Sequence, residues 1–377
     1  MRIAINTRLL IAGKMDGIGF FTAETTRRMV PLHPEHEFYL LFDRQPQLDF
    51  PLPANAHIVV LAPPARHPVL WYIFFEWSVT YALRRYRIDL FLSPDGWMSL
   101  RTKVPTLAVI HDINFEHSGG NLRPSHQRYM SHYFPLFARQ AARIATVSDF
   151  SRNDIANTYH IPTSKIDVVY DGAHSEYRPL PQSEQAQVRN KYTQGSPYFL
   201  FVSTIIRRKN LTNLLLAFDR FKDADASSTK LVVAGARVWW QDELKQAYDH
   251  MRHQSDVVFV GRIDTPQLAR LMASAQALVY PSLFEGFGMP ILEAFYSDTP
   301  VVTSNLTSMP EVAGDAALLV DPTRVDEIQS ALHRIDAEPA LRESLIQRGR
   351  IQRQHFSWDI TTQRLWSSLI QLSQHEA

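Results

Sequence analysis

Two glutamates flank a glycine-containing turn in the stretch ALVYPSLFEGFGMPILEAFYSDTP, residues 277–300. The apolar run at 277–280 has the length and composition of a buried strand, and Pro290 suits the first turn of a helix. A strand, a glycine loop and a helix N-terminus in this order present backbone N–H groups and a positive dipole end to an anion. Glu285 lies at the entry of the loop and Glu293 lies in the first turns of the helix, with seven residues between them.

Carboxylates beside an anion site would repel a phosphate, so Glu285 and Glu293 are suited to neutral hydroxyl groups, such as those of a ribose and a sugar. The backbone amides of Phe287, Gly288 and Met289 would then bind the charged part of the ligand. The ligand that this pattern implies is a nucleotide that carries a polyhydroxylated group. A second interpretation stays open, in which Glu293 only complements the helix dipole and Glu285 is a solvated loop residue.

Two adjacent cations, Arg208 and Lys209, follow an expected strand at 198–203. Cations at the carboxyl end of a parallel strand suit a pyrophosphate, because a positioned positive charge stabilises a departing anion. We expect no essential metal, since these cations and the helix dipole can supply the positive charge. The alternative is that residues 207–209 form a solvated loop.

Three positions in the first half of the chain also follow expected strands. His111 ends TLAVIHD, where its ring could hydrogen-bond a sugar hydroxyl or the reacting centre. Gly17 and Gly19, in DGIGFF, would let the backbone approach a ligand closely. A lone histidine is often structural, Asp112 would equally cap the segment that follows it, and Asp149 is expected only at a helix N-terminus.

Strand and helix patterns alternate along all 377 residues and predict an α/β protein with two domains of similar size. In the first half, strands are expected at 2–6, 38–42, 57–61, 90–93, 106–111, 143–148 and 166–170, with helices at 18–31, 70–86, 124–140 and 149–159. In the second half, strands are expected at 198–203, 230–234, 257–260, 277–280, 300–303 and 317–320. The polar residues 179–196 predict a linker that leads into a helix. Two mostly parallel, Rossmann-like sheets follow from this alternation.

Composition limits the classes of function. A formal net charge of +1 leaves no excess of cations to neutralise a nucleic-acid backbone, so we expect no nucleic-acid partner. The chain has no cysteine, which excludes disulfides and thiolate metal sites and suits a reducing cytosol. The N-terminal MRIAINTRLL lacks the apolar segment of a signal peptide and is interpreted as a first strand. We therefore expect a cytoplasmic protein.

The most membrane-like segment is PVLWYIFFEWSVTYAL, residues 68–83, which precedes Arg84, Arg85 and Arg87. Glu76 interrupts it, and it is shorter than the roughly 20 apolar residues of a spanning helix. Two interpretations stay open. One is a mostly buried helix that packs on the first sheet with its basic end solvated, and the other is a helix that lies on an anionic membrane face.

These motifs resemble those of retaining glycosyltransferases of family 4. EGFGMPILEA looks like their E-x7-E signature, and SMPEVAGDAALLVDP, residues 308–322, resembles the segment that follows it there. Further similar motifs occur in the expected order at 17–19, 111–112, 147–151, 168–172 and 208–210. The resemblance spans essentially the whole chain.

The resemblance implies the GT-B fold, with two Rossmann-like domains that face a central cleft. The N-terminal acceptor-binding domain would comprise residues 1–178, and the C-terminal nucleotide-sugar-binding domain would comprise residues 190–357. A final helix within 358–377 would cross back to the first domain. The backbone of Arg262 and Ile263, after the strand at 257–260, would line the base pocket.

The activity that the resemblance implies is transfer of a hexose from a nucleotide diphosphate sugar to a saccharide or lipid-linked acceptor, with retention of configuration, in bacterial polysaccharide synthesis. Arg208 and Lys209 would stabilise the departing nucleotide diphosphate, and more of that task falls to them because Ser203-Thr204 stands where many relatives have Gly-Arg. VSTIIRRKN is similar to VGTIEPRKN of many bacterial mannosyltransferases, which makes GDP-mannose the first candidate donor. No further cofactor is expected, and a lipid-linked acceptor would bring peripheral membrane association at the inner face.

Other functions stay open at this stage. A nucleotide-sugar epimerase has the same fold, as does a glycogen-type phosphorylase, which would need a lysine placed for pyridoxal phosphate. A non-catalytic subunit that binds a nucleotide sugar is the alternative from another class.

Overall fold

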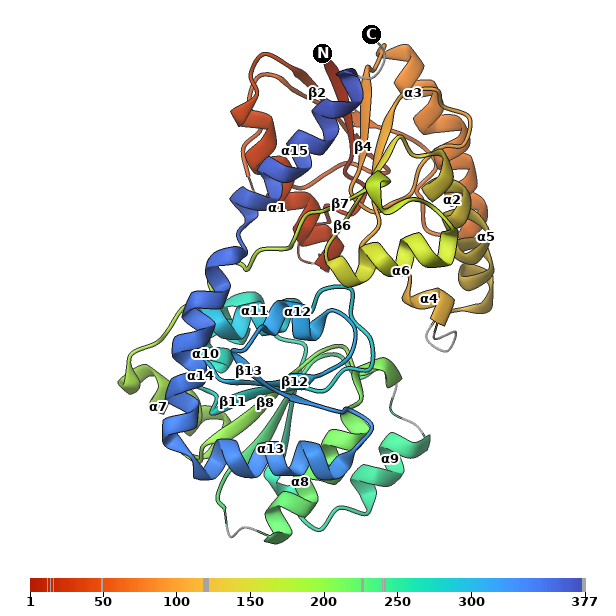
Figure 1. The fold of residues 1–377 in the computed structure, drawn as a ribbon. Helices are drawn as coiled ribbons and strands as arrows, with labels where there is room; N and C mark the ends of the chain where they lie inside the picture. Colours follow the sequence, from red (N-terminus) through yellow and green to blue (C-terminus); the bar gives the residue numbers. More distant parts are fainter. Residues whose placement is uncertain are drawn as a thin grey trace. The chain divides into compact units, whose positions relative to one another are not determined.

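The computed structural model describes residues 1–11, 13, 15, 17–48, 50–117, 122–224, 227–238, 240 and 242–374. The chain divides into two compact units, each built around its own parallel sheet (Figure 1). The first unit comprises Met1–Asp171 and Trp358–Ala377, and the second comprises Gly172–Ser357. The division therefore falls after Asp171 and not after residue 178, so the segment that follows Asp171 belongs to the second unit.

The sheet of the first unit has seven strands in the order β3-β2-β1-β4-β5-β6-β7. These strands are β1 (Arg2–Asn6), β2 (Glu37–Phe42), β3 (Ala56–Val60), β4 (Leu90–Ser93), β5 (Thr106–Val109), β6 (Arg143–Thr146) and β7 (Ile166–Val168). All neighbouring strands are parallel, and Ile3 pairs with Phe38 on one side and with Leu90 on the other. The order reverses between β1 and β4, which makes this the topological switch point of the sheet.

Helices cover the first sheet. They are α1 (Gly17–Leu32), α2 (Pro68–Ile73), the π-helix η1 (Phe74–Val79), α3 (Thr80–Arg85), α4 (Asn114–His117), α5 (Pro124–Gln140), α6 (Asp149–Tyr159), the 3-10 turn η2 (Thr163–Lys165) and α15 (Trp358–Gln374). The C-terminal helix α15 packs beside α1 and also contacts β4, β5 and β6 (Figure 1). The strands β4 and β5 are buried at every residue, as expected for strands covered on both faces.

The sheet of the second unit has six strands in the order β10-β9-β8-β11-β12-β13. They are β8 (Tyr198–Val202), β9 (Lys230–Ala234), β10 (Val257–Gly261), β11 (Ala277–Tyr280), β12 (Val301–Ser304) and β13 (Ala317–Val320), and all neighbours are parallel. The order reverses between β8 and β11, the two strands on which the predicted site depends.

The helical elements of the second unit are α7 (Gln182–Thr193), η3 (Arg207–Lys209), α8 (Leu211–Ala224), α9 (Asp242–Asp249), η4 (Gln254–Asp256), α10 (Thr265–Ser274), α11 (Met289–Tyr296), α12 (Met309–Ala313), α13 (Val325–Ala337), α14 (Pro339–Gln352) and η5 (Arg353–His355). Apolar side chains from β8, β9, β11 and α8 form a separate core, which includes Phe199, Phe201, Leu215 and Phe218.

The predicted α/β fold with two Rossmann-like sheets is confirmed, and every predicted strand is present with small shifts at its ends. The polar segment 179–196 predicts a linker that leads into a helix, and the helix α7 begins earlier than expected and occupies most of the segment itself. Only Val188 and Thr193 of α7 are buried, so the segment lacks an apolar periodicity, but its Gln, Glu, Ala, Arg and Lys residues are good helix formers. Among the helices that the structure describes, none combines the length and the apolar character needed to span a bilayer.

Candidate functional site

Polar side chains follow both strands at the switch point of the second sheet. Arg208 and Lys209 lie in the 3-10 turn η3 after β8, and Glu285 lies in the loop after β11. Open parallel sheets bind ligands outside the carboxyl ends of their strands at such a point. The topology therefore brings the predicted cations and the first predicted carboxylate together.

The Glu285 carboxylate contacts both cations and a buried tyrosine. Arg208 Nη1 lies 2.9 Å from Oε2 of Glu285, and Lys209 Nζ lies 2.6 Å from Oε1. The Tyr280 hydroxyl donates to Oε1 at 2.8 Å, and Lys209 Nζ donates to the Tyr280 oxygen at 2.7 Å. Arg208 also donates to the carbonyl of Phe284. Each charged group in this cluster is thus held by at least two partners.

The charges in this cluster decide the protonation state of Glu285. Burial of Glu285, which is 7% exposed, would by itself raise its pKa. The positive charges of Lys209 and Arg208 outweigh burial and lower the pKa of Glu285 to about 2. Burial raises the pKa of Tyr280 well above its usual value, so its hydroxyl stays protonated as a donor. The interpretation of Glu285 as a solvated loop residue is wrong, as is that of Arg208 and Lys209 as part of a solvated loop.

The loop before α11 is fixed by a glycine and a serine. Gly288 has a φ of 101°, in the left-handed region that disfavours other residues. Ser308 Oγ donates to the carbonyl oxygens of Glu285 and Phe287, at 2.9 Å each. Helix α11 begins at Met289, and the N–H groups of a first helical turn point out of the helix end. The three amides predicted to bind a charged group therefore lie at one helix N-terminus.

Glu293 lies on α11 and is 8% exposed. Burial raises the pKa of Glu293 to about 7, and a hydrogen bond with the Tyr177 hydroxyl opposes that rise. Tyr177 is itself 4% exposed and comes from the segment between Asp171 and α7. Complementing the helix dipole does not explain why this carboxyl is buried, and the contact of Glu293 with a ribose stays a prediction.

Arg262 and Ile263 follow β10, at the same edge of the sheet as Arg208 and Glu285. Arg262 is exposed and Ile263 is half-buried. The Gly235 N–H, just after β9, donates to the Gly261 carbonyl at the end of β10, at 2.8 Å. The role of Arg262 and Ile263 in binding a base stays a prediction.

In the first unit, His111 lies just beyond the end of β5 and is half-buried. Its Nε2 donates to the Pro94 carbonyl at 2.8 Å, and its ring meets Phe21 of α1 edge-on, with 4.9 Å between centroids. Because Nε2 carries the proton in this bond, Nδ1 is an acceptor when the ring is neutral. The predicted position of His111 at a strand end is confirmed, and its contact with a sugar stays a prediction.

The two predicted glycines of the first unit begin α1. Gly17 is exposed, and Gly19 is buried. A Cβ on Gly19 would lie 3.1 Å from Met15 Cβ and 3.2 Å from the Leu9 carbonyl, so chain packing alone requires a small residue there. Packing therefore explains why position 19 is a glycine, and the predicted approach of the Gly17 and Gly19 backbone to a ligand stays a prediction. The neighbouring residues 12, 14 and 16 lie outside the described part of the chain.

Two further predictions in the first unit concern helix caps. Asp112 accepts a hydrogen bond from the Asn114 N–H at 3.0 Å, which confirms its interpretation as a cap for α4. Asp149 is the first residue of α6, where Ser148 Oγ accepts from the Ser151 N–H at 3.0 Å.

A buried network that no sequence motif predicted lies at the switch point of the first sheet. Arg8 Nε lies 2.7 Å from Asp95 Oδ2, and Asn6 Nδ2 donates to Asp95 Oδ1 at 2.8 Å and to Ser93 Oγ at 3.1 Å. The arginine also lies over the Trp97 ring, 5.4 Å from its centroid. The sequence pattern that could have indicated this network is the run of polar residues at the ends of two buried strands. Within the described ranges, no three His, Asp or Glu side chains are grouped closely enough to hold a metal ion.

Two family models match most of the chain. "Glycosyltransferase Family 4" matches residues 15–177, and "Glycosyl transferases group 1" matches residues 182–352. O-antigen chain mannosyltransferase B of Escherichia coli is 31% identical over 365 residues, which cover 93% of this chain and 95% of that protein. O-antigen chain mannosyltransferase RfbU of Salmonella typhimurium is 27% identical over 273 residues, 72% of each chain.

The fold is similar to that of solved structures. Sucrose-phosphate synthase from Thermosynechococcus elongatus matches with a TM-score of 0.79 and 17% identity, over 100% of both chains. At this identity the likeness shows the fold alone.

Proposed function

The chain belongs to the glycosyltransferases of family 4, which have the GT-B fold, and we propose that it transfers mannose from GDP-mannose to a saccharide acceptor with retention of configuration. The observation that carries this proposal is the cluster of Arg208, Lys209 and Glu285 at the switch point beside the N-terminus of α11. The names of the two bacterial relatives support mannose as the sugar, and transfer in preference to epimerisation.

The donor nucleotide would bind to the second unit. Negative charge develops on the diphosphate as the glycosidic bond breaks, and preorganised cations lower the barrier to that step. Arg208 and Lys209 are already held in place by Glu285, so they need little rearrangement to bind a diphosphate. The N–H groups of Phe287, Gly288 and Met289 at the start of α11 would bind the sugar and the phosphates.

Hydroxyl groups of the donor would bind to the two glutamates. Glu285 is ionised at neutral pH and would accept hydrogen bonds from the mannose hydroxyls. Glu293 on α11 would accept from the ribose hydroxyls, and the backbone of Arg262 and Ile263 would line the base pocket.

In the proposed reaction the acceptor oxygen forms a bond to the anomeric carbon on the face that the phosphate leaves. The departing phosphate oxygen takes the proton of the acceptor hydroxyl, so that no protein nucleophile is needed. Positive charge comes from the two cations and the dipole of α11, and we propose that no metal is essential. His111 would hydrogen-bond a sugar hydroxyl.

The acceptor would be a growing bacterial polysaccharide, free or linked to a lipid. The O-antigen relatives support this class of acceptor. A lipid-linked acceptor would bring the protein to the inner face of the cell membrane as a peripheral protein.

Thermal unfolding with GDP, UDP, ADP or TDP, each with and without EDTA, tests the donor site first. A ligand that binds only the folded protein raises the unfolding midpoint by mass action. We expect GDP alone to raise it, EDTA to change nothing, and Glu293→Ala to abolish the shift. Glu343→Ala, which removes an exposed carboxylate on α14, is the matched control and should keep the shift. A shift with UDP and none with GDP would overturn the proposed donor, and a response that EDTA removes would overturn metal independence.

A further inference from the structure

One face of the helical stretch from α2 to α3 is apolar and exposed. Val69, Ile73, Trp77 and Tyr81 occur at every fourth position, and 60%, 37%, 56% and 66% of their surfaces are exposed. We call these four residues the aromatic stripe. The other side of the same helices is buried in the first core through residues such as Phe74, Phe75, Val79 and Leu83. The stretch therefore packs on the sheet and also leaves a second apolar face in solvent.

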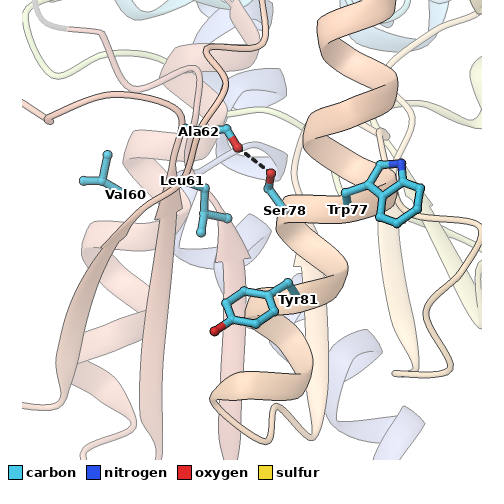
Figure 2. Close-up of a pocket in the computed structure, with 6 residues that line it drawn as sticks. All are labelled: Val60, Leu61, Ala62, Trp77, Ser78 and Tyr81. Atoms are coloured by element: carbon cyan, nitrogen blue, oxygen red, sulfur yellow. Dashed lines mark hydrogen bonds between the residues drawn. The ribbon is translucent and has the colours of Figure 1, made fainter.

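A pocket of about 420 Å³ lies beside the aromatic stripe. Figure 2 shows the residues that line it, which are Val60, Leu61, Ala62, Trp77, Ser78 and Tyr81. The Ser78 hydroxyl donates to the Ala62 carbonyl, which joins the helix to the segment after β3 (Figure 2). Edge strand β3 adds more exposed aliphatic surface, because Ile58 is 47% exposed and Val60 is 41% exposed. Large apolar residues grouped on a surface in this way indicate an interaction site.

Cations surround the aromatic stripe. Arg84 and Arg85 follow Tyr81 by three and four positions, so they lie on the same side of the helix. The Arg101 guanidinium lies over the Trp77 ring, 4.3 Å from its centroid. Over residues 56–104 the exposed cations are Arg66, Arg84, Arg85, Arg87, Arg101 and Lys103, and the exposed acidic residue is Asp89.

The nearest acidic group on the stripe's own helices offsets one of these cations, because Glu76 Oε2 lies 3.9 Å from Arg101 Nε. Glu76 is 4% exposed, and its carboxylate accepts from the Leu100 N–H at 2.9 Å and from Ser99 Oγ at 3.2 Å. Its charge is therefore shared between the fold and Arg101, and the exposed Arg84 and Arg85 at the end of α3 make the surface beside Tyr81 positive.

We propose that the aromatic stripe, with Arg84, Arg85 and Arg101, is a face that binds an anionic phospholipid bilayer. Trp and Tyr are suited to the headgroup level of a membrane, where their rings are apolar and their polar tips stay hydrated. The aliphatic side chains would lie just below them, and the arginines would contact lipid phosphates. This inference rests on the first unit alone and does not depend on the identity of the donor.

Two other occupants fit the surface less well. A saccharide needs hydrogen-bonding groups, and Ile58, Val60, Val69 and Ile73 offer only hydrocarbon. A second copy of the chain would bring the same excess of exposed arginines to the interface, with Asp89 as the exposed acid of residues 56–104 to offset them.

Sedimentation of the full chain with vesicles tests the proposal. One set of vesicles is neutral phosphatidylcholine, and the other also contains anionic phosphatidylglycerol. We expect binding to the anionic vesicles that weakens as salt is raised. Arg84→Gln with Arg85→Gln should weaken it roughly 30-fold at low salt, since each arginine near an anionic surface adds about 1 kcal/mol. Trp77→Ser with Tyr81→Ser should weaken it by about tenfold or more, since burial of each side chain is lost.

Two control variants test whether a loss of vesicle binding is specific to this face or is a general effect of fewer surface arginines or fewer exposed aliphatic side chains. Arg220→Gln with Arg252→Gln removes two exposed arginines elsewhere, and Leu32→Ser with Val238→Ser removes two exposed aliphatic side chains. Both controls should bind vesicles like the unmodified protein, and every variant should keep its thermal response to donor nucleotide. The proposal is overturned if the controls weaken binding as much as the stripe variants do, if anionic vesicles are not bound, or if the stripe variants abolish a dimer and leave vesicle binding unchanged.

Discussion

At the scale of single residues, Glu285 and Glu293 show how neighbours set the charge of two equally buried carboxyls. Both are under a tenth exposed, so burial favours the protonated form of each. Glu285 has Lys209 and Arg208 beside it, and its pKa falls to about 2. Glu293 has the neutral hydroxyl of Tyr177, and its pKa rises to about 7. One carboxyl is thus a permanent anion, and the other changes its charge near neutral pH.

Replacing Lys209 by methionine should lower both stability and activity. Removing one partner of a buried ion pair leaves an uncompensated charge, and the expected loss is about 3 kcal/mol of unfolding free energy in urea. The transfer rate should fall about 100-fold or more, as when one preorganised donor to a developing anion is removed.

Lys222→Met is the control, because Lys222 Nζ lies 2.9 Å from Asp256 and is 7% exposed, away from the predicted site residues. It should lower stability with little loss of transfer rate in the folded protein.

The lowered pKa of Glu285 makes a prediction about stability in acid. At pH values above 4.5, the usual pKa of this group, its ionised form stabilises the folded protein, and this contribution is lost as the pH falls toward 2. Lys209→Met should show less of that acid-dependent loss. An unchanged acid profile and an unchanged rate would contradict the assigned role of the cluster.

The raised pKa of Glu293 makes a second prediction about pH. The folded protein holds this proton up to about pH 7, whereas the unfolded chain releases it near 4.5, so stability falls as pH rises between these values. Glu293→Gln should remove this fall and be more stable than the unmodified protein at pH 8, by about 3 kcal/mol at most. If the ionised carboxylate binds the ribose, GDP affinity should rise with pH through 7.

Tyr177→Phe removes the hydrogen bond that lowers the pKa of Glu293, so the midpoint of the GDP affinity profile should move to higher pH. Isothermal calorimetry from pH 5.5 to about 8.5 measures both profiles within the stability range of most proteins. A profile that is flat in the unmodified protein, or unmoved in Tyr177→Phe, would argue against Glu293 as the ribose ligand.

At the scale of elements, the sequence was informative where strands end. Arg208, Lys209 and Glu285 could be grouped at one edge of the second sheet, because parallel strands place their carboxyl ends together, and His111 could be placed at a strand end of the first sheet. Tyr280 could be predicted as a strand residue, but its hydrogen bond to Glu285 could not. The direction of its side chain depends on the twist at the end of the strand, which the local sequence does not specify.

Other parts of the site depend on contacts that no local pattern carries. Ser308 reaches Glu285 and Phe287 across more than twenty residues of sequence, and Tyr177 meets Glu293 from a segment that precedes α7. The networks at Asp95 and at Tyr177 consist of residue types that are common on surfaces, so their burial is visible only in the fold.

A glycine after β9 provides a prediction at this scale. Gly235 has a φ of 149°, and a Cβ there would lie 1.7 Å from the Ser203 carbonyl oxygen, a backbone atom that cannot move aside. Gly235→Ala should therefore cost about 3 kcal/mol or more of unfolding free energy. Gly261→Ala is the matched control, with a φ of 70° and no atom within 4 Å of the added Cβ, and should cost only about 1 kcal/mol of backbone strain. Equal losses in urea unfolding would show that the strands do not approach as closely as described.

At the scale of the whole molecule, the same strand order serves two different purposes. Both sheets reverse at the strand that begins their unit, and both place charged side chains there. In the first unit Arg8 and Asp95 are buried and neutralise each other. In the second unit Arg208 and Lys209 both contact the carboxylate of Glu285, beside the N-terminus of α11. This difference favours the second unit as the one that binds the nucleotide.

If the two units stabilise themselves through separate cores, a ligand of one and a mutation in the other should act on different unfolding transitions. GDP should raise the midpoint of the transition of the second unit in scanning calorimetry, by mass action. Asp95→Asn weakens the buried ion pair with Arg8 and should lower the transition of the first unit while leaving the GDP response intact. The matched variant in the second unit is Lys209→Met, which should lower the other transition and reduce the GDP response. A single transition that all three changes move alike would contradict independent unfolding of the two units. Loss of the GDP response in Asp95→Asn would contradict the assignment of the nucleotide site to the second unit.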